Sequence, residues 1–249
     1  MPLVSHFQSL GHAALNFLYP PVCQMCRSER AGVDEGFVCA KCAAGVQFVT
    51  APFCERCGLP YEGEITNTFQ CGNCCEMELH FRTARSAVIA NQLLLEIIHA
   101  YKYRRALCFE PFLATLLIRE AAPILRQEKW DLIVPVPLHP VKQRQREFNQ
   151  AERLAHCLSR ATKIPVNKNL LRRVESTRTQ TMLSRPQRAE NVQRAFAMRP
   201  GKKLNGEKII LLDDVLTTGA TTSACAKILS DAGAGEICVW TAARGTLKL

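Results

Sequence analysis

The chain of 249 residues contains no run of apolar residues long enough to cross a bilayer. Residues 1–19 have an apolar tilt, but they lack a basic n-region and a convincing cleavage site. We expect a short helix there that packs on the body, and not a secretion signal. Aromatic residues make up only 7% of the chain, beside 47% hydrophobic and 22% charged residues. This composition is typical of a globular protein, which we expect to be cytoplasmic.

Positive charge is concentrated in one part of the chain. Residues 1–80 hold four Lys or Arg and eight Asp or Glu, whereas residues 138–203 hold 16 and four, a balance of +12. A basic field of this kind attracts phosphate-rich small molecules or nucleic acid, and a solvated face that only aids solubility is the alternative. The only aromatics in this segment are Phe148 and Phe196, which disfavours recognition of single strands by base stacking.

Nine of the 13 cysteines lie between residues 23 and 75. Eight of them form four Cys-x-x-Cys pairs, namely Cys23 with Cys26, Cys39 with Cys42, Cys54 with Cys57, and Cys71 with Cys74. The gaps inside the two halves are 12 and 13 residues, so residues 20–80 contain an internal duplication. A tight turn between two cysteines directs both thiolates at one tetrahedral ion, and this spacing is that of a double zinc ribbon.

Two structural zinc sites are therefore expected in residues 20–80. Disulfides are the rival explanation, but without a secretion signal the thiols are expected to be reduced and to bind metal. No ligand position is left open and no His-Glu pair lies nearby, which indicates structural sites. Sequential pairing of the cysteines is expected. Interleaved pairing, and Cys75 in place of Cys74, remain open from the sequence.

A second motif follows a short strand expected at residues 208–212. Asp213 and Asp214 come at the carboxyl end of this strand, and a loop of small and hydroxyl residues leads into a helix that stops near Gly233. In open α/β sheets, ligands bind beyond the carboxyl ends of strands, and a helix N-terminus there attracts phosphate. The loop residues are Thr217, Thr218, Gly219, Ala220 and Thr221.

This motif resembles the 5-phosphoribosyl-pyrophosphate (PRPP) loop of type I phosphoribosyltransferases. The resemblance implies that residues 217–221 hold the 5′-phosphate. It also implies that Asp213 and Asp214, the candidate catalytic residues, contact the ribose hydroxyls or a Mg²⁺ ion that accompanies PRPP.

A third motif begins with a buried strand expected at residues 131–136. Prolines at 135, 137 and 140 predict a rigid loop without further regular structure, followed by cations and by a helix over 151–162. Arginine binds phosphate oxygens by two parallel contacts, so this region suits a pyrophosphate. The candidate residues are Val136, Pro137, Leu138, His139, Arg144 and Arg146.

The motif at 135–150, with its Arg-x-Arg-x-Phe-Asn-Gln end, resembles the ComF/GntX-like proteins. Residues 98–103 also match, which adds Lys102 to the candidate ligand-binding residues, and so do Arg172 and Arg173. The resemblance covers residues 19–244. It implies a phosphoribosyltransferase fold preceded by a cysteine-rich zinc domain, and a link in some bacteria to DNA uptake during natural competence.

The segment 177–191 has few apolar residues and many cations. In the fold that the resemblance implies, it corresponds to a flap that closes over the ligand, and it could equally follow a nucleic-acid backbone. A solvent loop without a role is the alternative. The candidate flap or nucleic-acid residues are Arg178, Arg185 and Arg188.

The expected fold is α/β, with strands at 86–90, 131–136, 208–212 and 236–242 forming a mostly parallel sheet, and helices at 93–103 and 109–125, the second broken near Pro123. The expected divisions are 1–19, 20–80 and 81–249.

Two functions are compatible with these motifs. One is a PRPP-binding enzyme that uses Mg²⁺. The other is a non-catalytic adaptor that retains the fold. Its basic surface and zinc ribbons would contact single-stranded DNA, a competence helicase or other uptake machinery.

Overall fold

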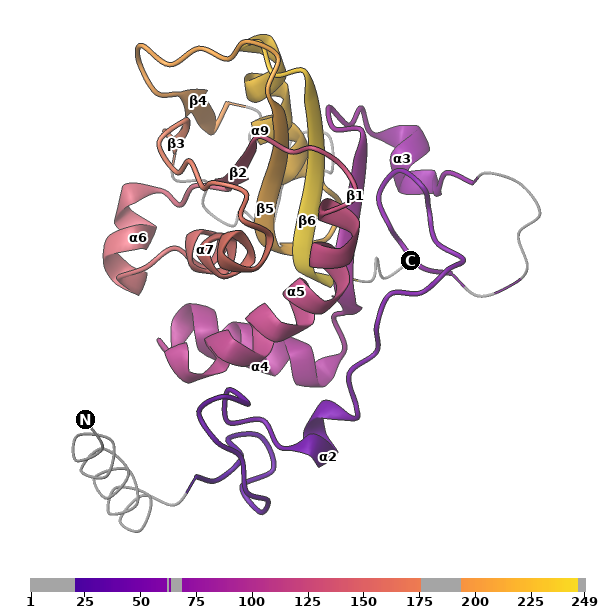
Figure 1. Ribbon diagram of the computed structural model, residues 1–249, viewed down its shortest axis with the longest axis vertical. Helices are drawn as coiled ribbons and strands as arrows, with labels where there is room; N and C mark the ends of the chain where they lie inside the picture. Colours follow the sequence, from indigo (N-terminus) through magenta and orange to yellow (C-terminus); the bar gives the residue numbers. More distant parts are fainter. Residues whose placement is uncertain (1–20, 62, 64–68, 176–193, 246–249) are drawn as a thin grey trace, which may run out of the picture.

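The computed structural model describes residues 21–61, 63, 69–175 and 194–245. In this part of the chain, a four-stranded sheet has the order β1-β6-β5-β2 with every neighbouring pair parallel (Figure 1). Strands β3 and β4 form a separate antiparallel pair. The expected α/β class with a mostly parallel sheet is therefore confirmed.

The described elements are α2 (Ala40–Ala43), α3 (Gly72–Glu76), β1 (Thr83–Ile89), α4 (Gln92–Tyr103), the 3-10 helix η1 (Leu107–Phe109), α5 (Glu110–Leu125), β2 (Leu132–Pro135), α6 (Pro140–Arg146), α7 (Gln150–Thr162), β3 (Leu171–Arg173), β4 (Phe196–Met198), β5 (Lys208–Leu216), α9 (Ala220–Asp231) and β6 (Glu236–Arg244).

Strand β5 is longer than the sequence predicts. It pairs with β6 from Lys208 to Leu216, whereas its other neighbour, β2, ends opposite Leu212. Asp213 and Asp214 therefore lie inside β5 and not beyond its end, because the pairing with β6 continues past them. The two carboxylates consequently occur where β5 extends past the end of β2.

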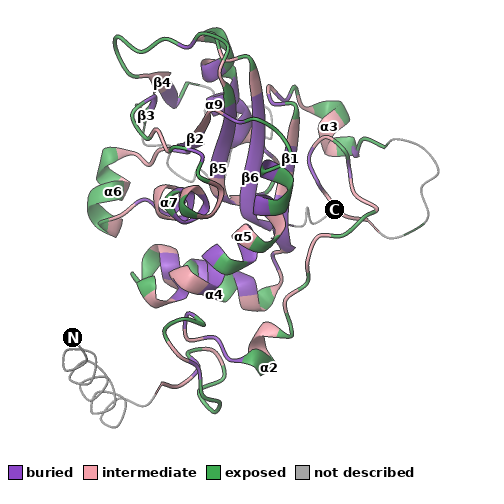
Figure 2. Cartoon of the chain, viewed as in Figure 1, coloured by how far each residue is buried: buried purple, intermediate pink, exposed green. Residues whose placement is uncertain are grey.

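The sheet is covered on both faces, as Figure 1 shows. On one face, Ile210 and Leu212 of β5 share a core with α4, α5 and α7. Their neighbours Ile209 and Leu211 point the other way, into a core with α9, β3 and β4. This alternation follows from the two-residue period of a strand, and it leaves β5 and β6 buried almost throughout (Figure 2).

The two halves of the cysteine region join the cores on opposite sides of the sheet, and the first half does so by packing on the helices that cover one face. Val38 of the first half belongs to the core with α4 and α5, and Gly36 approaches α5 so closely that a Cβ there would lie 2.6 Å from the Phe112 nitrogen. Three cysteines of the second half belong to the core with α9. Between the halves, Phe48 forms an antiparallel bridge with Val88, so the connection passes along the free edge of β1.

Three local predictions were wrong. Helix α5 continues through Pro123, which lies exposed in its last turn, where water can satisfy the carbonyl that the missing N–H leaves. A helix, α6, begins at Pro140 where a loop without regular structure was expected, because the first turn of a helix does not need that N–H. Strands β3 and β4 were not predicted, since three residues carry no readable period.

Two expectations fall outside the described residues: the helix over 1–19, and the flap candidates Arg178, Arg185 and Arg188. The boundaries of the three divisions remain predictions. None of the helices in the described ranges has the length and apolar character needed to cross a membrane.

Candidate functional site

The eight cysteines form two compact groups. Within each group of four, the sulfur atoms all lie within 4.8 Å of one another. The measured Sγ–Sγ distances are 3.8 Å for Cys23–Cys42, 3.7 Å for Cys26–Cys39, 3.8 Å for Cys54–Cys74 and 3.5 Å for Cys57–Cys71. Four thiolates placed tetrahedrally at about 2.3 Å from Zn²⁺ would be about 3.8 Å apart. Both groups therefore fit a structural zinc ion.

The grouping follows the sequential pairing expected from the spacing. We call Cys23, Cys26, Cys39 and Cys42 the first tetrad, and Cys54, Cys57, Cys71 and Cys74 the second tetrad. Backbone N–H groups support the sulfurs: Cys39 donates to Cys23 Sγ at 3.3 Å, and Cys71 donates to Cys54 Sγ at 3.4 Å. Cys75 is exposed and its Sγ lies 3.9 Å from the Gln70 carbonyl, so Cys74 and not Cys75 completes the second tetrad.

The paired carboxylates on β5 are neutralised in part by a lysine. Lys102 Nζ at the end of α4 lies 2.8 Å from Asp214 Oδ2, and both side chains are mostly buried. Burial raises the pKa of Asp213 to about 7, with a further contribution from the charge of Asp214 and opposition from Lys102. Burial alone would lower the pKa of Lys102, but Asp214 and Asp213 outweigh it and raise that pKa. Lys102 therefore pairs directly with Asp214, and its charge also acts on Asp213.

The loop between β5 and α9 forms a cradle. Gly219 has φ +89°, a left-handed conformation that glycine adopts without strain, and it caps the N-terminus of α9. Thr218 Oγ1 accepts a hydrogen bond from the Ala220 nitrogen at 3.3 Å. Asp213 and residues 215–222 enclose a hollow of about 50 Å³, the size of a small ion and not of a whole nucleotide. The first turn of α9 directs its N–H groups toward the loop, as anion binding requires.

The loop after β2 is held by the asparagine of the Phe-Asn-Gln motif. Asn149 Nδ2 donates to the Val136 carbonyl at 2.9 Å, while its Oδ1 accepts from the Ala151 nitrogen and caps α7. His139 Nδ1 accepts a hydrogen bond from the Val141 nitrogen at 3.3 Å and caps α6. The loop is therefore rigid, as its prolines predict, and the phosphate-binding role of His139 remains a prediction.

The two arginines of α6 have different surroundings. Arg144 is exposed and lines an open surface hollow with Pro140, Gln143 and Glu147. Arg146 stacks over the Tyr103 ring, 4.6 Å from its centroid, and donates to Gln150 Oε1 at 3.3 Å. The structure thus brings Arg146 next to α4, which carries Lys102, whereas the role of Arg144 rests on the sequence alone.

Two more cations belong to this group: Lys142, one of the cations expected after the prolines, and Arg173, which the sequence indicated only through its match to the family. Burial, and then the charges of Arg173 and Arg146, lower the pKa of Lys142. Burial also lowers the pKa of Arg173, which Cys225 and Asp213 partly offset. Lys142 and Arg173 therefore lie near enough to Arg146 to interact electrostatically with it, and Arg173 also interacts with Asp213. The Arg172–Arg173 pair was visible in the sequence, but the strand that turns Arg173 inward was not.

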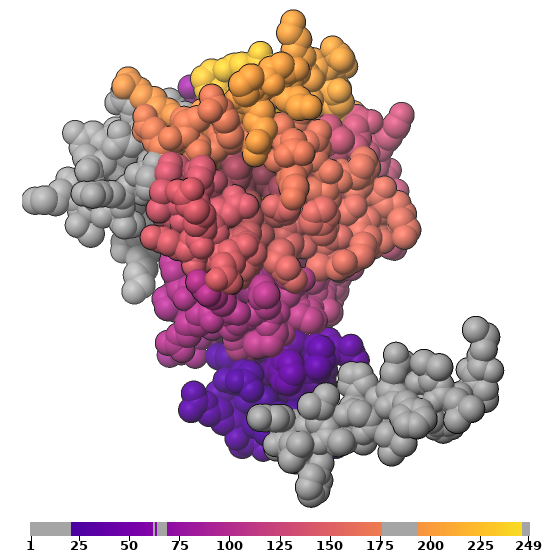
Figure 3. Space-filling view, turned by 90° about the vertical axis from the view of Figure 1, so that its left-hand side faces the viewer, coloured from indigo at the N-terminus to yellow at the C-terminus, as the bar shows by residue number. Residues whose placement is uncertain are grey.

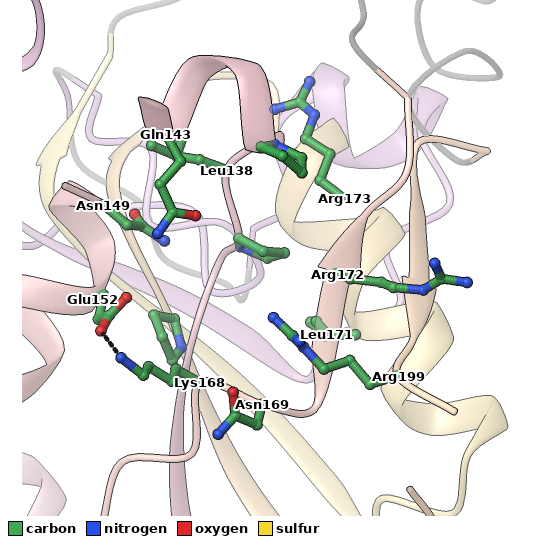
Figure 4. A pocket seen from close by; sticks show the side chains of 13 residues that line it. Leu138, Gln143, Asn149, Glu152, Lys168, Asn169, Leu171, Arg172, Arg173 and Arg199 are labelled. Carbon is green, nitrogen blue, oxygen red and sulfur yellow. Dashed lines mark hydrogen bonds and ion pairs between the residues drawn. The ribbon is translucent and has the colours of Figure 1, made fainter. Parts of the chain in front are cut away.

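A second hollow of about 240 Å³ lies between the β2–α6 loop, α7 and β3 (Figure 4). Gln143 from α6 and Arg199, just after β4, extend toward its middle from opposite walls. An ion pair of 2.6 Å between Lys168 and Glu152 lies along another wall. The lining of this pocket combines polar side chains with apolar prolines and Leu171. The sequence did not predict the pocket.

Comparison with known proteins identifies the family. A model of the double zinc ribbon domain matches residues 14–75. The chain is also 32% identical over 230 residues to competence protein F of Haemophilus influenzae, a match that covers 89% of this chain and 96% of that protein. The chain belongs to the competence protein F family. The family resemblance expected from the sequence motifs is therefore confirmed.

Other relatives in the competence protein F family carry related names. The DNA utilization protein YhgH of Salmonella typhimurium is 29% identical, with 90% of this chain and 97% of that protein covered. Competence protein ComFC of Bacillus subtilis is 26% identical, with 79% of each chain covered. The family is thus named for competence and for DNA utilisation.

Solved structures with a similar fold include phosphoribosyltransferases. A hypoxanthine phosphoribosyltransferase from Staphylococcus aureus gives a TM-score of 0.36 at 10% identity and covers 56% of this chain and 75% of that one. A purine phosphoribosyltransferase from Pyrococcus horikoshii gives 0.33 at 15% identity, covering 51% and 70%. Because both scores lie below 0.5, no residue of the site is assigned from these structures.

Proposed function

We propose that this member of the competence protein F family binds PRPP together with Mg²⁺ at the carboxyl ends of β2 and β5, as part of DNA utilisation. One observation carries the proposal: the loop at 136–139 follows β2, the carboxylate pair lies in the neighbouring parallel strand β5 just past the end of β2, and the loop at 217–221 follows β5 at the same end of the sheet. Such an edge is where open α/β sheets bind their ligands.

Each part has a separate role in this proposal. The N–H groups and hydroxyls of residues 217–221 hold the 5′-phosphate in the 50 Å³ hollow. Asp213 and Asp214 accept hydrogen bonds from the ribose hydroxyls or hold Mg²⁺. The backbone of 136–139 and the cations Arg144 and Arg146 face the pyrophosphate.

The same arrangement suits phosphoribosyl transfer. Mg²⁺, when bound, would stabilise the negative charge of a leaving pyrophosphate. The carboxylates of Asp213 and Asp214 would stabilise positive charge that develops on the ribose ring, because they are held in a buried and preorganised position. Lys102 neutralises Asp214 when no other cation is present.

The test is PRPP binding by calorimetry on the zinc-loaded protein, with and without Mg²⁺. The wild type should show saturable, Mg²⁺-dependent binding, which an Asp213→Asn, Asp214→Asn double variant should lose. Asp131→Asn is the matched control, since this carboxylate lies at the opposite end of the sheet and accepts a hydrogen bond from the Lys208 nitrogen. Unchanged PRPP affinity in the double variant, or no binding by the wild type, would contradict the proposal.

A second candidate function is contact with a DNA backbone without phosphoribosyl transfer. Segments 140–175 and 195–205 lie side by side on one face of the molecule (Figure 3). Arg172 and Arg199 on this face are exposed beside the 240 Å³ hollow. Phosphate contacts of this kind weaken as salt rises. An Arg172→Gln, Arg199→Gln variant should then lose salt-sensitive DNA binding and retain PRPP binding, whereas the double Asp variant should do the opposite.

A further inference from the structure

Arg244, the last residue of β6, lies fully buried between the second tetrad and the phosphate loop. Its Nη1 donates to three carbonyls, those of Leu216 at 2.9 Å, Thr217 at 2.6 Å and Gly245 at 2.7 Å. Its Nη2 points the other way and donates to the sulfur of Cys57 at 3.5 Å. One guanidinium therefore joins a cysteine of the second tetrad to the beginning of the loop.

The second tetrad contacts the loop at two further places. Asn73, which lies between two of its cysteines, donates from Nδ2 to the Thr218 carbonyl at 3.0 Å. Leu79 and Phe81, shortly after the tetrad, pack beneath Gly219, where a Cβ would lie 3.4 Å and 3.6 Å from their side chains. Asn73, Leu79 and Phe81 therefore contact the side of the loop that faces the cysteines.

These contacts set the direction of the loop's peptide groups. The carbonyls of Leu216, Thr217 and Thr218 all accept hydrogen bonds from Arg244 or Asn73. In a trans peptide the N–H of the next residue points opposite to the carbonyl, so the N–H groups of residues 217–219 are turned away from the tetrad. Residues 217–219 also line the 50 Å³ hollow, so we infer that these N–H groups point into it, as an anion site needs.

The charge of Arg244 also requires a partner. In the described ranges, no carboxylate forms an ion pair with it, and its Nε has no hydrogen-bond acceptor. A buried charge without compensation is strongly unfavourable. Four thiolates around Zn²⁺ carry a net charge of about −2, because each cysteine ligand is deprotonated, and Cys57 would bring that charge directly to the guanidinium.

We propose that Arg244 is a positioning residue that couples metal binding in the second tetrad to phosphate binding by the loop at 217–221. A metal-bound Cys57 thiolate holds the guanidinium, which in turn holds the loop carbonyls, so each binding event favours the other. The first tetrad lacks this link, since its cysteines pack toward the face of α4 and α5. The proposal rests on the proposed function only for the identity of the phosphate ligand.

The first experiment compares Cys74→Ser with Cys42→Ser in the full-length protein. These two cysteines hold the same position in their halves and are both partly buried. Ribose 5-phosphate is the probe, measured by calorimetry. We expect Cys74→Ser to weaken its binding at least about tenfold and Cys42→Ser to leave it unchanged, since groups that hold a binding residue in place typically affect a site by about 10- to 100-fold. Equal effects of the two variants would overturn the coupling.

The second experiment measures zinc retention against a graded chelator in Arg244→Lys, which keeps the charge but cannot reach the carbonyls and the sulfur together. In the variant, the chelator should remove one of the two zinc ions at a concentration at least about tenfold lower than in the wild type, and the other ion should be retained as in the wild type. Ribose 5-phosphate should protect the labile ion against the chelator only in the wild type. Retention of both ions at wild-type levels would overturn the proposal. The unchanged ion reports that the first half of the cysteine region is folded in the variant.

Asn73→Ala provides a milder variant of the same interface. It removes one hydrogen bond to Thr218 and should weaken ribose 5-phosphate binding while both zinc ions are retained. Unchanged ribose 5-phosphate binding in this variant would contradict the inference that these hydrogen bonds orient the peptide groups of the loop. If the wild type itself binds no ribose 5-phosphate, the proposed function fails, and the zinc retention of Arg244→Lys still decides whether Arg244 secures the second tetrad.

Discussion

The ion pair between Lys102 and Asp214 offers a quantitative test of the carboxylate pair. Its Nζ–Oδ2 distance is 2.8 Å, with side-chain exposures of only 20% and 8%. Replacing Lys102 with Met leaves the buried Asp214 carboxylate without its ion-pair partner, and breaking a buried pair in this way costs about 3 kcal/mol or more. For a chain of this size, that corresponds to a decrease in Tm of about 6–12 °C.

The pH dependence of this loss has a definite sign. The pKa of Asp213 is raised to about 7, so the folded protein binds an extra proton below that pH and loses stability as the pH rises through it. Lys102 opposes this rise in pKa, so its removal shifts the pKa of Asp213 still higher. The decrease in Tm of Lys102→Met should therefore be larger at pH 8 than at pH 5.5.

Thermal unfolding followed by circular dichroism provides the measurement. The matched control is Lys168→Met, which breaks an exposed pair with Glu152 whose distance is even shorter, 2.6 Å. Exposed pairs contribute about 0–1 kcal/mol, so the control should change the Tm by no more than about 4 °C. Excess Mg²⁺ should restore part of the stability of Lys102→Met by replacing the ammonium. A Tm for Lys102→Met within the range of the control at pH 8 would refute the reasoning.

Three further outcomes are expected. Zinc analysis of the wild type should give about two ions per chain. After dialysis, Cys74→Ser should retain about one ion and Cys75→Ser should retain two, because Cys74 and not Cys75 belongs to the second tetrad. The affinity for PRPP with Mg²⁺ should rise by up to about tenfold per pH unit below pH 7 and level off above it, as calorimetry would show, because Asp213 must lose its proton. Gly219→Ala should cost about 1–2 kcal/mol in chemical denaturation and weaken ribose 5-phosphate binding, since φ there is +89° and Leu79 lies 3.4 Å from the added Cβ.

The sequence predicted those parts of the fold that depend on neighbours in the chain. The cysteine tetrads follow from local spacing, and the strands at 131–136 and 208–212 follow from unbroken apolar runs. The continuation of β5 through Asp213 and Asp214 could not be predicted, because two adjacent carboxylates are typical of the end of a strand. Only the pairing with β6 shows that the strand continues.

The parts of the site that were missed depend on distant contacts. Arg173 belongs to a strand of three residues, too short for a recognisable period, and Arg244 resembles an exposed cation at a strand end. Its burial comes from a contact with Cys57, 187 positions earlier in the chain. Helix α6 was missed for another reason. A proline in a sequence is normally taken to interrupt a helix, and Pro140 is recognised as the first residue of a helix only once His139 is known to cap it.

The attachment of the two cysteine halves to the cores on opposite sides of the sheet has a consequence for folding during synthesis. Both halves leave the ribosome before the strands and helices that will cover them, and domains generally form from the N-terminal end. Val38 and Cys57 must therefore wait for partners in α5 and β6 that are made later. Zinc gives each half a compact form during that interval, because metal binding supplies folding free energy on the order of 10 kcal/mol per site. The metal ions would stabilise each half before the hydrophobic core that it later joins has formed. Refolding without zinc should accumulate a species in which the sheet and its helices have formed while the two cysteine halves have not packed on them.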